Sequence, residues 1–174
     1  MYIPKYFTPK ELFPPEISIP INGKFDPRNW RRFDERILMM ADQIREDHGP
    51  MTGNEGGLTG CGFRLPIKKH ATIHQTCWDH YDFDTLSQHP FGRAIDGHPK
   101  EKDVFSIRKS IILNRFKYLH IHFLEIDIFG KNSGKPWLHF DCRNFTRGTN
   151  GAPQLWSPKR GFVSVDEYLQ WGDK

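Results

Sequence analysis

The clearest pattern of hydrophobic and polar positions lies between residues 31 and 50, in RRFDERILMMADQIREDHGP. Apolar side chains recur there at helical spacing, so that one side of a helix is apolar and the other is charged. These apolar residues are Phe33, Ile37, Met40, Ala41 and Ile44. Gly49 and Pro50, the last two residues of this segment, supply a stop signal for the helix. We therefore predict an amphipathic core helix in this segment.

Further segments carry shorter patterns. A second amphipathic helix fits within residues 101–116, and a short closing helix fits residues 164–174. Strand-like runs occupy residues 120–129 and 137–142, and the GKNSGKP between them is typical of a turn. The sequence RAID, residues 93–96, is predicted to form another short strand. Together these elements predict an α+β fold, with helices packed on a small, mainly antiparallel sheet.

The N-terminal segment, residues 1–33, is rich in proline and predicts irregular structure. One short helical turn is expected within residues 8–13, where Thr8 precedes a proline at the first helical position. The chain has 174 residues, which favours one domain over residues 1–174 with its own core. The residues with the most distinctive chemistry lie between 51 and 143.

Charge and composition narrow the choice of partner. The net charge is +4 and the isoelectric point is near 9.0, which suits an anionic partner such as nucleic acid or an acidic cell-wall polymer. The lysines and arginines are scattered, however, and no nucleic-acid-binding motif is present. We therefore expect no nucleic-acid partner.

The N-terminus and the cysteines bear on the cellular compartment. MYIPKYFTPKELF is interrupted by prolines and predicts no signal peptide, and no apolar run is long enough to span a membrane. Cys61, Cys77 and Cys142 are odd in number and form no CxxC pair. That pattern favours reduced thiols over a disulfide framework, and synthesis in a cytoplasm.

The strand predicted at residues 137–142 has two chemically different sides, because side chains alternate along a strand. Leu138, Phe140 and Cys142 share one side and form a plausible core face. The other side carries Trp137, His139 and Asp141. An aromatic ring, an imidazole and a carboxylate on one strand face are compatible with a functional site and also with an exposed polar surface.

A second group of polar residues lies in SQHPFGRAIDGH, residues 87–98. His89 and Asp96 are seven positions apart, which is not a helical neighbour spacing. Pro90 and Gly92 favour a turn between them. A histidine on that turn and a carboxylate on the following strand can converge with His139. Two histidines and one carboxylate leave a fourth position open on zinc, as catalytic zinc sites do.

These residues carry a family resemblance. Ser87-x-His89-x-x-Gly92-x-Ala94-x-Asp96 resembles the SxHxxGxAxD signature of the zinc D-Ala-D-Ala carboxypeptidase and hedgehog-like metallopeptidase superfamily. PWLHFD resembles that family's later histidine motif, and GCGFR is similar to its segment with a functional arginine. The resemblance implies a hedgehog/DD-peptidase-like fold, a Zn²⁺ bound by His89, Asp96 and His139, and a substrate-binding or oxyanion-stabilising Arg64.

The N-terminal YFTPKELF and the HGPMTGN segment resemble phage-encoded members, which cleave peptidoglycan peptides. The resemblance implies a zinc peptidase made in a host cytoplasm, acting at the bacterial cell wall or as part of a virion. A peptidoglycan peptide would then be the substrate. The alternative is a catalytically silent module of a phage virion or tail that keeps zinc for stability.

The general base is where the sequence departs from the family pattern. Many members have a glutamate three residues before the last zinc histidine, and that position here is Pro136. IHFLE resembles the version in which the base ends the preceding strand, which points to Glu125. Asp127 is the reserve candidate, because a regular strand would place it on the same face as Glu125.

Other polar residues receive weaker assignments. His120 and His122 form an HxH pair, but strand alternation turns them away from the Glu125 face, so we expect no metal there. Ser87 is expected to hydrogen-bond around the turn that carries His89. Gly92 is expected to permit a close backbone approach that a Cβ atom would block. His70, His74 and His80 receive no role.

Overall fold

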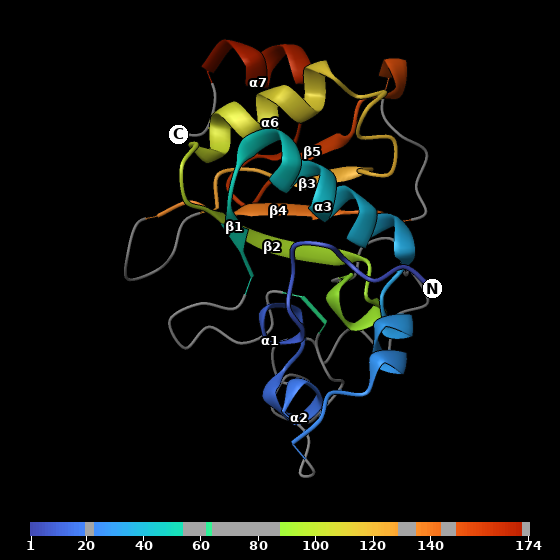
Figure 1. The fold of residues 1–174 in the computed structure, drawn as a ribbon. Helices are drawn as coiled ribbons and strands as arrows, with labels where there is room; N and C mark the ends of the chain where they lie inside the picture. Colours follow the sequence, from blue (N-terminus) through green and yellow to red (C-terminus); the bar gives the residue numbers. More distant parts are fainter. Residues whose placement is uncertain (20–22, 54–61, 64–87, 129–134, 144–148, 172–174) are drawn as a thin grey trace.

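The computed structural model describes residues 1–19, 23–53, 62–63, 88–128, 135–143 and 149–171. In these segments several helices accompany one open six-stranded sheet (Figure 1). The α+β class predicted from the sequence is therefore confirmed.

The sheet is mixed, with the strand order β1-β2-β4-β3-β5-β6. Its strands are β1 (Met51–Thr52), β2 (Ala94–Pro99), β3 (Phe123–Glu125), β4 (Leu138–Asp141), β5 (Gln154–Ser157) and β6 (Gly161–Val163). Strands β3 and β5 run parallel, and the other neighbouring pairs are antiparallel. The sequence predicted β2, β3 and β4 but neither the β5–β6 hairpin nor the parallel pairing that joins it to the sheet.

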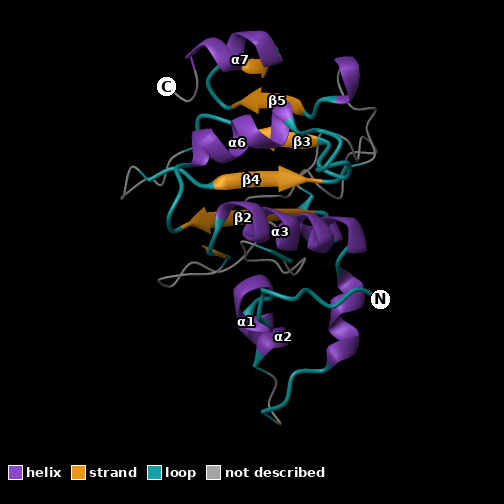
Figure 2. Cartoon of the chain, turned by 45° about the horizontal axis from the view of Figure 1, so that its top comes forward, coloured by secondary structure: helices purple, strands orange, loops and turns teal. Residues whose placement is uncertain are grey.

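Three helices correspond to the predicted ones: α3 (Glu35–His48), α6 (Val104–Leu113) and α7 (Val165–Trp171). Helix α3 starts at Asp34, whose carboxylate accepts a hydrogen bond from the Arg36 backbone N–H, and it ends at Gly49 with φ +86°. Figures 1 and 2 show α3 and α6 crossing the same side of the sheet. Among the described helices, none is long and apolar enough to cross a membrane.

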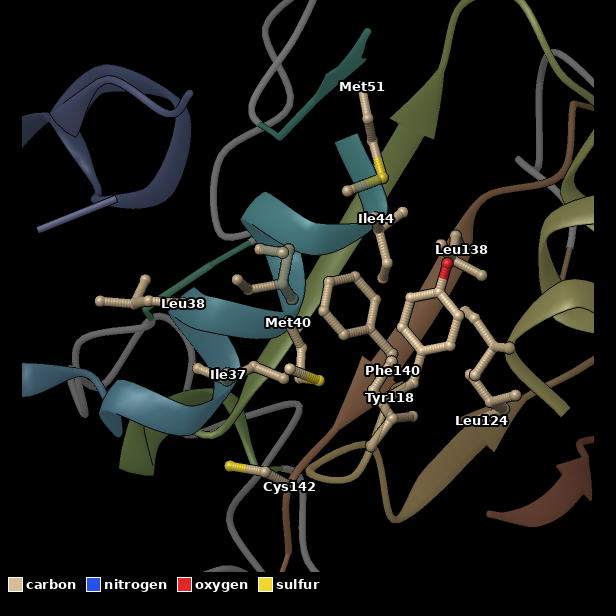
Figure 3. Packing of buried hydrophobic residues seen from close by; sticks show 14 of the residues in the cluster. Ile37, Leu38, Met40, Ile44, Met51, Tyr118, Leu124, Leu138, Phe140 and Cys142 are labelled. Carbon is tan, nitrogen blue, oxygen red and sulfur yellow. The ribbon is translucent and has the colours of Figure 1, made fainter. Parts of the chain in front are cut away.

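The hydrophobic core lies between these helices and the sheet. Ile37, Met40 and Ile44 of α3 pack in one cluster with Leu138 and Phe140 of β4 (Figure 3). Burial of each such side chain stabilises the fold by about 1.5–3 kcal/mol. A one-residue slip of β4 would turn Leu138 and Phe140 away from the helices, so this core pins the register of the strand. The opposite face of β4 is thereby assigned to His139 and Asp141.

The N-terminal segment is more ordered than its proline content predicts. Its described residues, 1–19 and 23–33, contain three short helices, namely α1 (Pro9–Leu12), α2 (Pro15–Ser18) and the 3₁₀ helix η1 (Pro27–Arg32). Only α1 was predicted, and the Glu11 carboxylate accepts hydrogen bonds from the Thr8 backbone N–H and hydroxyl at 2.8 and 2.9 Å. The Asp42 carboxylate of α3 accepts the Tyr2 hydroxyl and the Lys5 backbone N–H, both at 2.6 Å. These contacts hold the segment against α3.

Candidate metal centre

The strand register gathers three polar side chains on the sheet face away from α3. Asp96 of β2 is the register partner of His139 of β4, and His139 is also the partner of Glu125 of β3. Register partners in neighbouring strands point to the same side of a sheet. The three residues therefore form a row across β2, β4 and β3.

His89 reaches this row from a short 3₁₀ turn, η2 (His89–Phe91), just before β2. The turn closes with a hydrogen bond from the Gly92 backbone N–H to the His89 carbonyl oxygen at 3.0 Å. Gly92 has φ +62°, a left-handed conformation that favours glycine. The Gly92 carbonyl oxygen accepts a hydrogen bond from the Asp34 N–H at 2.9 Å, so the turn is fastened to the start of α3.

The close approach predicted at Gly92 is confirmed. A Cβ atom built there would lie 1.9 Å from the Arg32 carbonyl oxygen, a backbone atom that cannot move aside like a flexible side chain. At Gly161, which has a similar φ of +76°, a Cβ atom would meet nothing within 4 Å. The two glycines therefore separate the cost of the left-handed backbone from the cost of the clash.

We predict that Gly92→Ala destabilises the protein far more than Gly161→Ala. Both changes place alanine at positive φ, which costs about 1–2 kcal/mol. Gly92→Ala adds the clash, and we expect a total loss of roughly 3 kcal/mol or more in the free energy of unfolding. Urea denaturation of both variants measures the difference. Equal losses would show that the turn moves freely away from Arg32.

Three side chains in the described part of the chain form one group with metal-ligand potential: His89, Asp96 and His139. One ligand atom from each lies within 4.8 Å of the others. His139 Nδ1 is 2.7 Å from Asp96 Oδ1, and His89 Nε2 is 3.4 Å from Asp96 Oδ2. The two imidazole rings meet at 61° with 5.3 Å between their centroids. This is the same triad that the sequence motifs predict.

The triad is almost entirely shielded from solvent. His89, Asp96 and His139 are 2%, 9% and 7% exposed. Burial opposes the charged form of Asp96, but the neighbouring imidazoles hold the pKa of its carboxyl well below the usual value. Burial likewise lowers the pKa of His139, yet Asp141 and Asp96 outweigh it and raise that pKa to about 10. The Asp141 and Asp96 carboxylates thus favour a positive charge at the site, which a metal cation can supply.

A hydrogen bond at Nδ1, the ring nitrogen that faces away from Asp96, orients the imidazole of His89. His89 Nδ1 donates to the Gly62 carbonyl oxygen at 2.8 Å, because a carbonyl can only accept. That bond leaves Nε2 directed toward Asp96. Gly62 is itself held close to α1, since the Phe63 N–H donates to the Leu12 carbonyl oxygen at 2.8 Å. The N-terminal segment thus supports a candidate metal ligand.

Glu125 lies beside the triad with a partly buried carboxylate. Within the described residues this carboxylate makes no hydrogen bond or ion pair. Burial raises the pKa of its carboxyl above the usual value, with a further increase from the Asp96 charge. His139, Arg108 and Arg143 act in the opposite direction. A carboxylate with a raised pKa, next to a group of metal ligands, is suited to accept and return a proton.

Asp127 does not share this environment. Strand β3 ends at Glu125, and Asp127 has φ +57°, which breaks the alternation assumed in the sequence analysis. Its carboxylate accepts the Ser157 hydroxyl at 2.7 Å and lies 3.5 Å from Arg160 Nε. Asp127 is therefore engaged by the β5–β6 hairpin and is a poor candidate for the base.

The remaining predicted residues lie outside the ligand group or outside the described residues. His122 Nδ1 donates to the Arg143 carbonyl oxygen at 2.6 Å, and the described ligand group contains neither His120 nor His122. Arg64, Ser87, Cys61 and Cys77 lie outside the described residues, as do the unassigned histidines His70, His74 and His80. The predicted role of Arg64 therefore stays a prediction. Cys142 is a free, buried cysteine.

Sequence reasoning missed the importance of Asp141. It was recognised only as a polar residue on the His139 face, whereas the structure buries it completely, with Oδ2 3.5 Å from His139 Nε2. Its position two residues after His139 was the available signal, because such residues share a strand face.

The fold and the site together define an α+β protein with a buried two-histidine, one-carboxylate candidate metal centre on its sheet. Comparisons with protein-family models, with curated proteins and with solved structures found no match for this chain.

Proposed function

We propose that this protein is a zinc-dependent peptidase that hydrolyses peptide bonds in bacterial peptidoglycan, with a hedgehog/DD-peptidase-like fold and a phage origin. The observation that carries the proposal is the row of Asp96, His139 and Glu125 across three strands, completed by His89. The substrate class and the origin rest on the resemblance of the motifs. The site of action would be the cell wall, reached after synthesis in a host cytoplasm.

The donor set fits zinc. Imidazole nitrogens and a carboxylate oxygen are ligands that zinc accepts, and three protein ligands leave one coordination position for a reactant. Carboxylate-rich sites that favour Mg²⁺ or Ca²⁺ lack such paired imidazoles. When bound, zinc would polarise the scissile carbonyl and lower the pKa of a water molecule at the site.

Glu125 supplies the proton transfer in this proposal. Its carboxylate takes a proton from the attacking water and returns it to the nitrogen of the leaving amine. The raised pKa helps the second step, since a carboxyl that holds its proton more firmly stays available as an acid. Pro136 has no ionisable group, so it cannot perform either transfer.

Pro136 also favours the second candidate, a silent zinc-binding module of a phage virion or tail. If Glu125 does not replace the usual base, the triad would only stabilise the fold. The two candidates agree on metal binding and differ on hydrolysis, so hydrolysis has to be measured directly.

We predict that the zinc-loaded protein solubilises purified cell walls and that a chelator stops the reaction. Walls with diaminopimelate-containing and lysine-containing stem peptides would be incubated with loaded protein, with chelated protein, and with chelated protein given zinc again. Loss of turbidity together with new free amino groups is expected in the first and third cases. No released amino groups from any wall type would support the silent module.

A further inference from the structure

Asp141 and Arg143 form a buried ion pair immediately behind His139. Arg143 Nε donates to Asp141 Oδ1 and Oδ2, both at 2.8 Å, and its terminal nitrogen also contacts Oδ2. The Arg143 backbone N–H donates to the same carboxylate at 3.1 Å. The carboxylate is thereby held in one orientation, with Oδ2 toward His139.

The Phe123 ring of β3 packs against both Arg143 and His139. The Arg143 guanidinium lies 3.7 Å from the centroid of the Phe123 ring, a cation–π arrangement. The His139 ring packs against the same phenyl ring at 90°, with 6.4 Å between the centroids. Phe123 is the register partner of Asp141, so all four groups share one sheet face. The imidazole, carboxylate and guanidinium therefore have little freedom to reorient.

We propose that Asp141 is a positioning residue that orients His139 for metal binding, and that Arg143 holds Asp141 in place. Asp141 Oδ2 faces His139 Nε2 at 3.5 Å, while His139 Nδ1 faces Asp96. A proton kept on Nε2 by Asp141 leaves the lone pair of Nδ1 for the metal. The inference rests on the metal site of the proposed function but not on peptide hydrolysis.

A purely structural ion pair is the competing explanation. Asp141→Asn separates the two, because the amide keeps the size of the side chain but loses its charge. The amide can also turn its NH₂ group toward His139 Nε2, which would favour a proton on Nδ1, the nitrogen the metal needs. A positioning role thus predicts weaker metal binding even where the fold is intact.

Asp127→Asn is the matched control. The Asp127 side chain is also completely buried and also lies near an arginine, 3.5 Å from Arg160 Nε, but it faces the β5–β6 hairpin. Both variants remove a buried negative charge, so a general loss of stability affects both. Only Asp141→Asn alters the surroundings of His139.

The experiment measures zinc affinity by competition with a chromophoric chelator, together with the visible spectrum of the cobalt-substituted protein. For Asp141→Asn we expect about 10- to 100-fold weaker zinc binding and an altered cobalt spectrum. Asp127→Asn should match wild type in both. Arg143→Gln retains the Asp141 carboxylate but removes the guanidinium that holds it in place, and it serves as the test if Asp141→Asn fails to fold. We expect its zinc affinity to fall by a smaller factor.

Unchanged zinc affinity and an unchanged cobalt spectrum in folded Asp141→Asn would overturn the positioning role. If Asp141→Asn does not fold, wild-type affinity in Arg143→Gln overturns the proposed arrangement, in which the orientation of His139 depends on the hold of Arg143 on Asp141. A wild-type protein that binds no zinc would remove both this inference and the metal centre. Wild-type zinc binding without wall hydrolysis would contradict only the peptidase proposal, because these readouts do not involve hydrolysis.

Discussion

His139→Ala is expected to abolish stoichiometric zinc binding, from about one zinc per chain in the wild type to none. Asp96 lies between the two histidines of the triad, and His139 Nδ1 contacts its carboxylate at 2.7 Å. Its removal leaves one imidazole and one carboxylate, which are too few to hold zinc against a competing chelator. Elemental analysis after dialysis against a weak chelator measures the occupancy.

His120→Ala is the control for this prediction. It removes an imidazole from the neighbouring HxH pair, which lies outside the ligand group, so occupancy should stay at the wild-type value. Full zinc occupancy in His139→Ala would show that the triad is not the metal site. Loss of zinc in His120→Ala instead would transfer the assignment to the HxH pair.

Glu125→Gln is expected to lower the rate of peptide hydrolysis by about 10²–10⁴-fold while zinc and the fold are retained. Glutamine is nearly the same size as glutamate but cannot accept the proton. Glu125 is the register partner of His139, but its carboxylate is not a member of the ligand triad. Zinc occupancy should therefore not change. Peptide release at saturating wall concentration and zinc content are measured on the same preparation.

Asp127→Asn distinguishes Glu125 from the reserve base. The Asp127 carboxylate accepts a hydrogen bond from the Ser157 hydroxyl and is directed away from the triad. This variant should therefore hydrolyse wall peptides at the wild-type rate. If Asp127→Asn loses the activity and Glu125→Gln does not, the two roles are exchanged. If neither change slows an active protein, the base lies outside β3 and the residues that follow it.

Much of the fold is encoded in local patterns. The apolar spacing that ends at Gly49 predicted α3, and the alternation around Phe140 predicted β4 with its core face. Such elements are predictable because each buries a continuous apolar face. The β5–β6 hairpin has short strands of mixed character, and its parallel pairing with β3 depends on contacts distant in sequence. No local pattern specifies that pairing.

The candidate metal ligands were also predictable, because the motif around His89 and Asp96 and the strand carrying His139 impose a recognisable spacing. The choice between Glu125 and Asp127 was not. Strand alternation placed them on one face, whereas the left-handed backbone of Asp127 turns that carboxylate toward Ser157. This change of backbone direction depends on packing against the β5–β6 hairpin, and the spacing of residues in the sequence does not indicate it.

The sequence by itself determined the α+β class, the main core helix and the three candidate ligands, since these follow from periodicity and from two short motifs, one with His89 and Asp96 and one with His139. Only the tertiary structure decided which carboxylate lies beside the triad and which nitrogen of His139 faces Asp96. It alone brought Gly62 to His89 and directed the Asp141 carboxylate at His139. These outcomes depend on strand register and side-chain orientation, which are fixed by packing across the whole sheet.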